Sequence, residues 1–99
     1  MEGEVLQLQW MDHTRIFSQA VTALRGKSCY TDATLACEGK FYPVHKFVLS
    51  TCSDYFTCIF EYTPCVNPVV VINNIASKDL EAILDFMYCG EISIRESQI

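Results

Sequence analysis

The sequence predicts an α+β domain in which a small mixed sheet is flanked by helices. Three patterns predict it: the chain opens on alternating apolar and polar residues, apolar residues recur at helical spacing in four later segments, and turn residues separate short β-branched runs. A length of 99 residues leaves room for one hydrophobic core. We therefore expect a single domain that spans residues 1–99.

The first two elements are a strand and a helix. Residues 5–10 alternate in polarity, which places Leu6, Leu8 and Trp10 on one face of a half-buried strand. A helix follows, with Asp12 as its N-cap and Gly26 at its end. Its apolar stripe consists of Ile16, Phe17, Ala20, Val21 and Leu24.

The middle of the chain predicts a hairpin and then two short helices. Residues 32–37 and 41–44 read as strands around a Gly-containing turn, with Pro43 confined to a strand end or sheet edge. From His45 the apolar spacing becomes helical. Ser53 is expected to interrupt this pattern and to cap a second short helix.

The last third of the chain predicts a strand, a helix and a final strand. Residues 68–72 are nearly all β-branched, which is typical of a strand covered on both faces. Ser77 is expected to cap a helix that Gly90 ends. A short strand over residues 91–94 follows.

The first strand has no hairpin neighbour in the sequence, because a helix follows it at once. Its unpaired backbone groups must find a distant strand or another chain. The last strand, with Ile92 and Ile94, presents a similar edge, so pairing between two chains would satisfy both edges. The first helix would then pack on its copy through the stripe, although the stripe could instead pack on the chain's own sheet. The predicted dimer interface comprises Leu6, Leu8, Trp10, Ile16, Phe17, Ala20, Val21, Leu24, Ile92 and Ile94.

Composition excludes several classes of function. A net charge of −5 does not suit binding to a phosphate backbone, so we expect no direct contact with nucleic acid. The sequence shows neither a membrane-spanning apolar run nor a signal peptide, so we expect no membrane association. No nucleophile–base pair or phosphate-binding loop is apparent, so we predict no enzyme and no cofactor.

The six cysteines have two interpretations. A disulfide framework would suit a secreted domain, whereas reduced thiols suit the cytosol or nucleus. We favour reduced thiols that act mostly as small buried hydrophobic residues. Their spacing, with His13 and His45, completes no zinc pattern, so no metal is expected.

Four stretches of the chain resemble the BTB/POZ family, and together they span almost all of it. They are Leu8-x-Trp10-x-x-His13 and the segments 31–36, 43–56 and 84–92. The opening motif is most similar to the insect Tramtrack-type group, whose members are mainly chromatin-associated, nuclear transcription regulators. Met11-Asp12 departs from that group, which commonly has two Asn there.

The resemblance implies a domain-swapped homodimer in which the first strand of one protomer joins the last strand of the other. It also implies assembly beyond dimers, association with other BTB proteins or corepressors, and DNA binding by separate domains. The chain ends before the final helices that most family members carry, so we expect an N-terminal fragment of a longer protein.

The resemblance places Asp32 and Lys46 in a charged pocket near the dimer interface. An ordinary ion pair between the hairpin and the next helix is the other interpretation, and it would contribute little if exposed. His45 is expected to be a half-buried, hydrogen-bonded residue at a helix start.

Two other functions compete with homotypic association. Some BTB proteins are substrate adaptors of a cullin-3 ubiquitin ligase, usually with an apolar-x-Glu element in the loop after the second short helix. Here that loop, residues 62–67, contains no carboxylate. A channel-type tetramerisation domain is the other alternative, but such domains generally lack the first strand.

Overall fold

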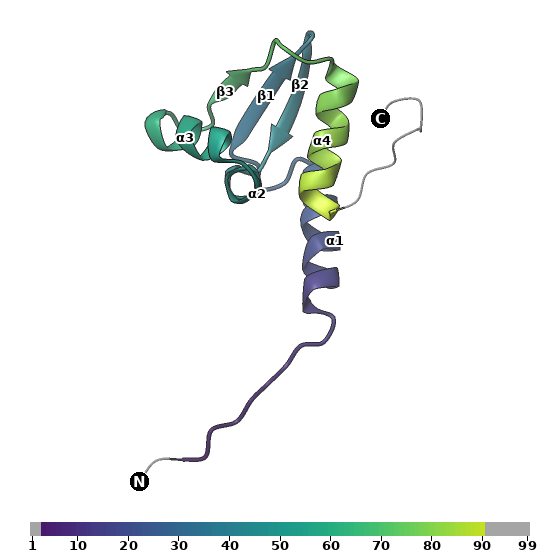
Figure 1. The fold of residues 1–99 in the computed structure, drawn as a ribbon, viewed down its shortest axis with the longest axis vertical. Coiled ribbons are helices and arrows are strands. Elements are labelled where there is room, and N and C mark those ends of the chain that lie inside the picture. Colours follow the sequence, from purple (N-terminus) through teal and green to yellow (C-terminus); the bar gives the residue numbers. More distant parts are fainter. Residues whose placement is uncertain (1–2, 91–99) are drawn as a thin grey trace.

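A computed structural model describes residues 3–90, and it confirms an α+β fold (Figure 1). A three-stranded sheet lies above α1 in this view, and α2, α3 and α4 pack beside it. The elements are, in chain order, α1 (His13–Gly26), β1 (Ala33–Cys37), β2 (Lys40–Val44), α2 (Lys46–Cys52), α3 (Asp54–Tyr62), β3 (Val69–Val71) and α4 (Ser77–Cys89).

The sheet is mixed, as the sequence predicts, and its strand order is β2-β1-β3. β1 and β2 form an antiparallel hairpin, and β3 returns through α2 and α3 to pair parallel to β1. The hairpin turns on Glu38 and Gly39, whose φ angles are 50° and 76°. Two consecutive positive φ angles are typical of the turn that joins twisted strands most closely. Pro43 lies in β2, an edge strand, as expected.

Helix ends follow the residues that the sequence singles out. The Ser53 hydroxyl accepts a hydrogen bond from the Phe56 amide (3.4 Å), which starts α3 directly after α2 ends. Gly90 adopts a left-handed conformation (φ 76°) and its amide donates to the Phe86 carbonyl, which closes α4. Asp12 precedes α1, but its side chain makes no capping hydrogen bond and pairs instead with Arg15 at 3.4 Å.

Four expectations about strands and caps need correction or lie outside the described residues. Residues 5–10 form no strand in this chain, because nothing in residues 3–90 pairs with them. β3 is not covered on both faces: Val69 and Val71 are 59% and 66% exposed, because the helices cover one side of this edge strand. Ser77 is the first residue of α4 rather than its cap. The strand expected over residues 91–94 lies outside the described residues.

The hydrophobic core lies between the inner face of β1 and the helices. Leu35 at the centre of β1 is fully buried, as are Val44 of β2 and Leu49 of α2, while Leu84 of α4 is 2% exposed. Burying an aliphatic side chain of this size stabilises a fold by about 1.5–3 kcal/mol. One compact cluster of this kind accounts for the packing of every strand and helix that surrounds β1.

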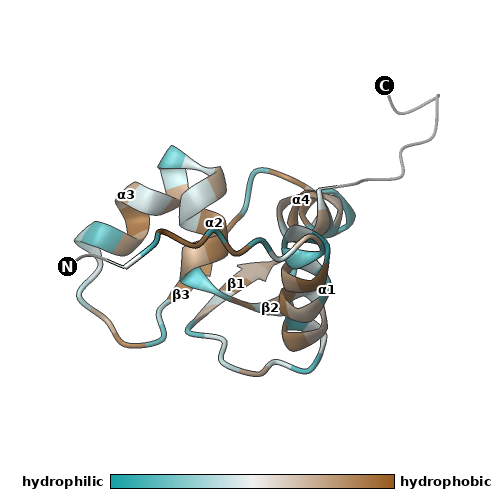
Figure 2. Cartoon of the chain, turned by 90° about the horizontal axis from the view of Figure 1, so that it is seen from below, coloured by the Kyte–Doolittle hydropathy of each residue, from teal (hydrophilic) through white to brown (hydrophobic). Residues whose placement is uncertain are grey.

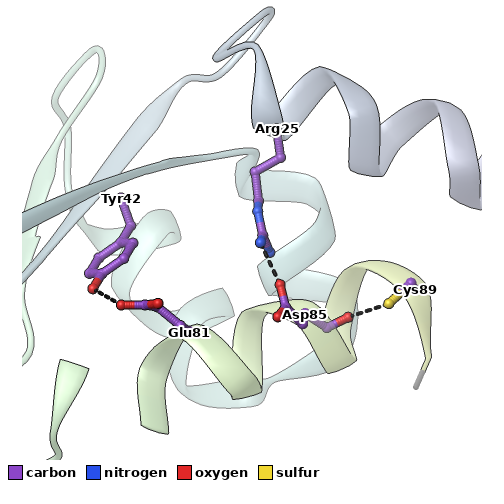
Figure 3. Close-up of polar contacts among 5 residues, drawn as sticks. All are labelled: Arg25, Tyr42, Glu81, Asp85 and Cys89. Atoms are coloured by element: carbon purple, nitrogen blue, oxygen red, sulfur yellow. Dashed lines mark hydrogen bonds and ion pairs between the residues drawn. The ribbon is translucent and has the colours of Figure 1, made fainter. Parts of the chain in front are cut away.

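Polar contacts fasten α4 to the elements on either side of it (Figure 3). The Tyr42 hydroxyl donates to Glu81 (2.6 Å), which raises the pKa of Tyr42, and Arg25 pairs with Asp85 (2.6 Å). At the start of α4 the Glu38 carboxylate accepts from the Ser77 amide (2.5 Å). This hydrogen bond lowers the pKa of Glu38, because it favours the charged form. Glu38 therefore supplies the cap that the sequence assigned to Ser77.

The pH dependence of stability tests this cap. Because the pKa of Glu38 is lower in the folded chain than in the unfolded one, its contribution is present above the unfolded pKa and is lost as the pH falls through the folded pKa. We expect the free energy of unfolding of the wild type, measured in urea, to exceed that of Glu38→Gln at neutral pH. The difference should narrow between about pH 5 and about pH 3.

An exposed carboxylate without such a contact provides the control. Glu61→Gln, at an exposed position of α3, should leave the same pH profile unchanged. A difference between wild type and Glu38→Gln that is constant across this pH range would contradict the capping role.

Candidate interaction surface

The N-terminal arm, defined here as residues 3–10, extends away from the rest of the domain (Figure 1). Its apolar residues are uncovered: Leu6 is 78% exposed, Leu8 93% and Trp10 59%. Soluble monomers rarely expose contiguous apolar surface without a function for it. The three arm residues predicted for the interface are thus accessible in the single chain.

The predicted stripe of α1 divides between the surface and the core. Ile16 and Phe17 are 38% and 52% exposed, Ala20 is exposed and Leu24 is half-buried. Val21 differs, because it packs into the core of its own chain at 8% exposure. The burial of Val21 is thus explained within one chain, and its place in the dimer interface stays a prediction. Hydrophobic segments lie along both the arm and α1 (Figure 2).

An aromatic series joins the arm to α1. The Trp10 ring meets the His13 ring edge-on at 4.9 Å between centroids, and His13 stacks on Phe17 at 5.9 Å. These contacts fix the point where the arm leaves the helix. The arm and the exposed side of α1 therefore form one continuous surface.

A cavity of about 250 Å³ opens beside this surface, between α1, α2 and α4. Phe17 and Val21 line it from α1, Phe47 and Val48 from α2, and Met87 from α4. Phe47 is 52% exposed, and it is not among the residues that the sequence predicts for the interface. The feature of the sequence that could have pointed to Phe47 is its position beside Val48 in α2. Helical spacing alone, however, does not show which side of a short helix stays exposed.

Asp32 and Lys46 do meet, but not as an ion pair. The Asp32 carboxylate accepts a hydrogen bond from the Lys46 backbone amide (2.7 Å) and so caps α2. The Lys46 ammonium lies 6.0 Å from the centre of the Phe60 ring. Within residues 3–90 the ion pairs are Asp12–Arg15 and Arg25–Asp85. The contact expected as an ion pair is therefore a helix cap, and the charged pocket stays a prediction.

His45 is more deeply buried than expected, at 3% exposure, and it lies at the centre of a polar network. Its Nε2 lies 2.8 Å from the Cys29 carbonyl, which can only accept, so Nε2 carries the hydrogen. Its Nδ1 then accepts from the Tyr88 hydroxyl (2.8 Å), and that oxygen accepts from the His45 amide (2.8 Å). Burial raises the pKa of Tyr88, and the Arg25 guanidinium lies 4.7 Å from the centre of its ring. The network ties together α1, α2, α4 and the loop after α1.

The cysteines are less buried than expected. Cys37 is buried, and burial raises its pKa, but Cys29, Cys52, Cys58, Cys65 and Cys89 are exposed. No disulfide joins two cysteines within residues 3–90. Over residues 3–90 no group of His, Cys, Asp and Glu is arranged to hold a metal ion. Over the same range no helix is long and apolar enough to cross a membrane.

Tyr88→Phe tests whether the buried network stabilises the fold. Removing the hydroxyl leaves the His45 amide and Nδ1 without their shared partner inside the core. Leaving buried polar groups unpaired costs about 1–3 kcal/mol, so we expect the urea midpoint to fall accordingly.

Tyr42→Phe is the matched control, because its hydroxyl contacts Glu81 at an exposed position. It should cost less than about 1 kcal/mol. Equal losses from the two tyrosines would contradict the structural role of the network.

Together, these features describe a small α+β domain with a large open apolar surface. Such a surface is typical of domains that bind other proteins. Residues 21–99 match the model of the BTB/POZ domain, and the chain belongs to this family.

Curated relatives from Drosophila melanogaster support the same assignment. The chain is 38% identical to "Longitudinals lacking protein-like" over 93% of this chain and 72% of that protein. It is 36% identical to the alpha isoform of protein tramtrack over 100% of this chain and 12% of that protein. It is 37% identical to "Transcription activator GAGA" over 98% of this chain and 17% of that protein. It thus spans a small part of the last two relatives.

Solved structures agree with the fold. The BTB domain of zebrafish PATZ1 superimposes with a TM-score of 0.84 at 26% identity, covering 94% of this chain and 76% of that one. The BTB domain of human gigaxonin gives 0.79 at 23% identity, covering 97% and 79%, and supports the fold alone. The expectation of a BTB/POZ domain similar to the Tramtrack group is confirmed.

Proposed function

We propose that this domain is a homotypic association module of a nuclear transcription regulator. The arm of one chain would add a strand to the sheet of a second chain, and the exposed sides of the two α1 helices would pack together. The observation that carries this proposal is the continuous, uncovered apolar surface formed by Leu6, Leu8 and Trp10 of the arm and Ile16 and Phe17 of α1.

Energetics favour a contact that uses the arm and α1 together. Burying one large apolar side chain contributes about 1.5–3 kcal/mol. Association costs about 4–15 kcal/mol in lost translational and rotational freedom before any affinity appears. Several of these side chains must therefore be buried at once, and a two-fold axis would use each of them twice.

The role in transcription follows from the relatives rather than from a site. One relative is named as a transcription activator. The acidic charge of −5 suits a domain that brings protein partners together, with DNA contacted by other parts of the protein. Joining two such proteins raises the local concentration of their other domains without a new contact to DNA. Other BTB proteins and corepressors are the expected further partners, and no catalysis is proposed.

The adaptor of a cullin-3 ubiquitin ligase remains the second candidate function. The nearest apolar-x-Glu sequence ends at Glu61, which lies inside α3 rather than in the loop that follows it. The loop itself offers no carboxylate. If the purified domain retained cullin-3 in a near-stoichiometric amount, the adaptor role would become the first candidate function and homotypic association the second.

Leu8→Asp and Phe17→Asp test the proposed interface. Each substitution would place an unpaired charge in the contact, and burying such a charge is costly. We expect each variant to lose the association of the wild type, with the mass falling toward the 11.3 kDa of one chain on dilution. Light scattering across a dilution series measures this.

Lys78→Glu is the control, because it changes charge at an exposed position of α4 away from the arm. It should keep the mass of the wild type. A wild-type chain that stays monomeric at micromolar concentration, or a Phe17→Asp variant that remains a folded dimer at every dilution, would refute the proposed interface.

A further inference from the structure

His13 lies in the middle of the surface proposed for association. It is the first residue of α1, and its ring lies between Trp10 of the arm and Phe17 of the helix. The Trp10 ring meets it edge-on at 4.9 Å between centroids, and the Phe17 ring stacks on it at 5.9 Å. Both neighbours belong to the proposed contact. A partner that covers these two rings therefore also covers the imidazole between them.

The surroundings that a partner would complete around His13 are apolar or neutral. The His13 amide donates to the Trp10 carbonyl at 3.1 Å, which holds the start of the helix beside the arm. His13 is exposed in the single chain, so water reaches its ring. It also lines the cavity between α1, α2 and α4, whose other lining residues are apolar, as Phe47 and Met87 are, or carry neutral hydroxyl groups. Association would replace water by these groups.

Within α1 the surroundings of His13 disfavour a positive charge. The backbone amides in the first turn of a helix carry partial positive charge, which opposes a cation at that end. Asp12 precedes His13, but its carboxylate pairs with the Arg15 guanidinium at 3.4 Å, so its charge is already balanced. The face of the Phe17 ring attracts a cation, yet such a contact does not replace full hydration.

The elements packed beside this end of α1 supply no unpaired carboxylate near His13, as far as residues 3–90 show. In the arm the acidic residue is Glu4, at the far end from α1 (Figure 1). On α4, Asp85 pairs with Arg25 at 2.6 Å, and on α2 the charged residue is Lys46, a further cation. The other titratable residues of α2 and α4 are two cysteines, one tyrosine and three residues in the first turns of α4: Cys52, Cys89, Tyr88, Lys78, Asp79 and Glu81.

We propose that the charge of His13 regulates the association of this chain, a role that rests on the function proposed above. A neutral imidazole fits the contact beside Trp10 and Phe17. A protonated imidazole is buried there without a carboxylate, and burying an unpaired charge is costly. Histidine is the side chain whose charge ordinarily changes between about pH 5 and about pH 8. The module therefore associates at neutral pH and separates as the pH falls.

The sign of this effect is opposite to the one that the overall charge predicts. The associated form binds fewer protons than two separate chains, so acidification shifts the equilibrium toward separate chains. The whole chain has a net charge of −5 at pH 7, and this charge decreases toward the pI of about 4.8. A smaller net charge reduces the repulsion between copies and favours association. Weaker association on acidification thus indicates a histidine rather than the net charge.

The dissociation constant of the 99-residue chain tests the proposal at about pH 7.5 and about pH 5.5, on either side of the ordinary histidine titration. Light scattering across a dilution series measures it. A histidine that is kept neutral in the associated form opposes association about tenfold for each pH unit below its ordinary titration range, and each dimer holds two copies. We expect the dissociation constant of the wild type to rise at least about tenfold at the lower pH.

His13→Phe and His13→Lys separate the charge of this residue from its shape. The phenylalanine keeps an aromatic ring beside Trp10 without a titrating group, so its dissociation constant should not rise on acidification. The lysine is charged at both pH values, so His13→Lys should associate weakly at both. The second histidine of the sequence, His45, is the same in all of these chains and serves as the internal control.

Two further measurements keep the comparison valid. Circular dichroism with urea unfolding at each pH confirms that every chain is folded. His13→Gln, which is neutral and polar, replaces His13→Phe if the phenylalanine impairs folding.

The outcomes distinguish the failure of this proposal from the failure of the proposed function. If the wild type associates equally at both pH values, or if folded His13→Phe weakens as much as the wild type, His13 does not regulate association and the proposed function stands. If His13→Lys associates as tightly as the wild type at neutral pH, burial of this residue in the contact is refuted. If the wild type and His13→Phe both stay monomeric at micromolar concentration and neutral pH, the proposed function itself fails.

Discussion

The structure depends on the burial of one side of β1. This strand pairs with both other strands, and its inward side chains form the centre of the core, where Leu35 is fully buried. Because the helices pack on that side, the side of the sheet that faces away from them is left without a cover. A chain of 99 residues buries a limited share of its surface, so covering one face of the sheet leaves the other for solvent or a partner.

A small number of polar contacts fix how the helices sit on this core. Asp32 caps α2 and Glu38 caps α4, and both carboxylates come from the ends of β1 rather than from the helices that they cap. His45 and Tyr88 then link α2 with α4 inside the core. The hairpin thus determines where two helices begin. A change in either carboxylate would affect the packing of a helix that lies far from it in the sequence.

Most of the local structure could be predicted from the sequence, because caps, turn residues and apolar spacing act over a few residues. The ends of α1 and α4, the hairpin and the break at Ser53 are examples. The errors concern contacts between distant residues. The cap of α4 comes from Glu38 across the hairpin turn rather than from Ser77 beside the helix. Apolar runs such as residues 69–71 do not reveal whether a strand lies at the centre or the edge of a sheet.

The exposed apolar residues lie on two different parts of the molecule, the arm with α1 and the edge strands of the sheet. The arm leaves the domain at the free end of α1, whereas the sheet lies at the other end of that helix (Figure 1). Contacts at these two places do not compete for the same residues. A chain that used the arm and α1 in the proposed association would therefore keep the open side of its sheet.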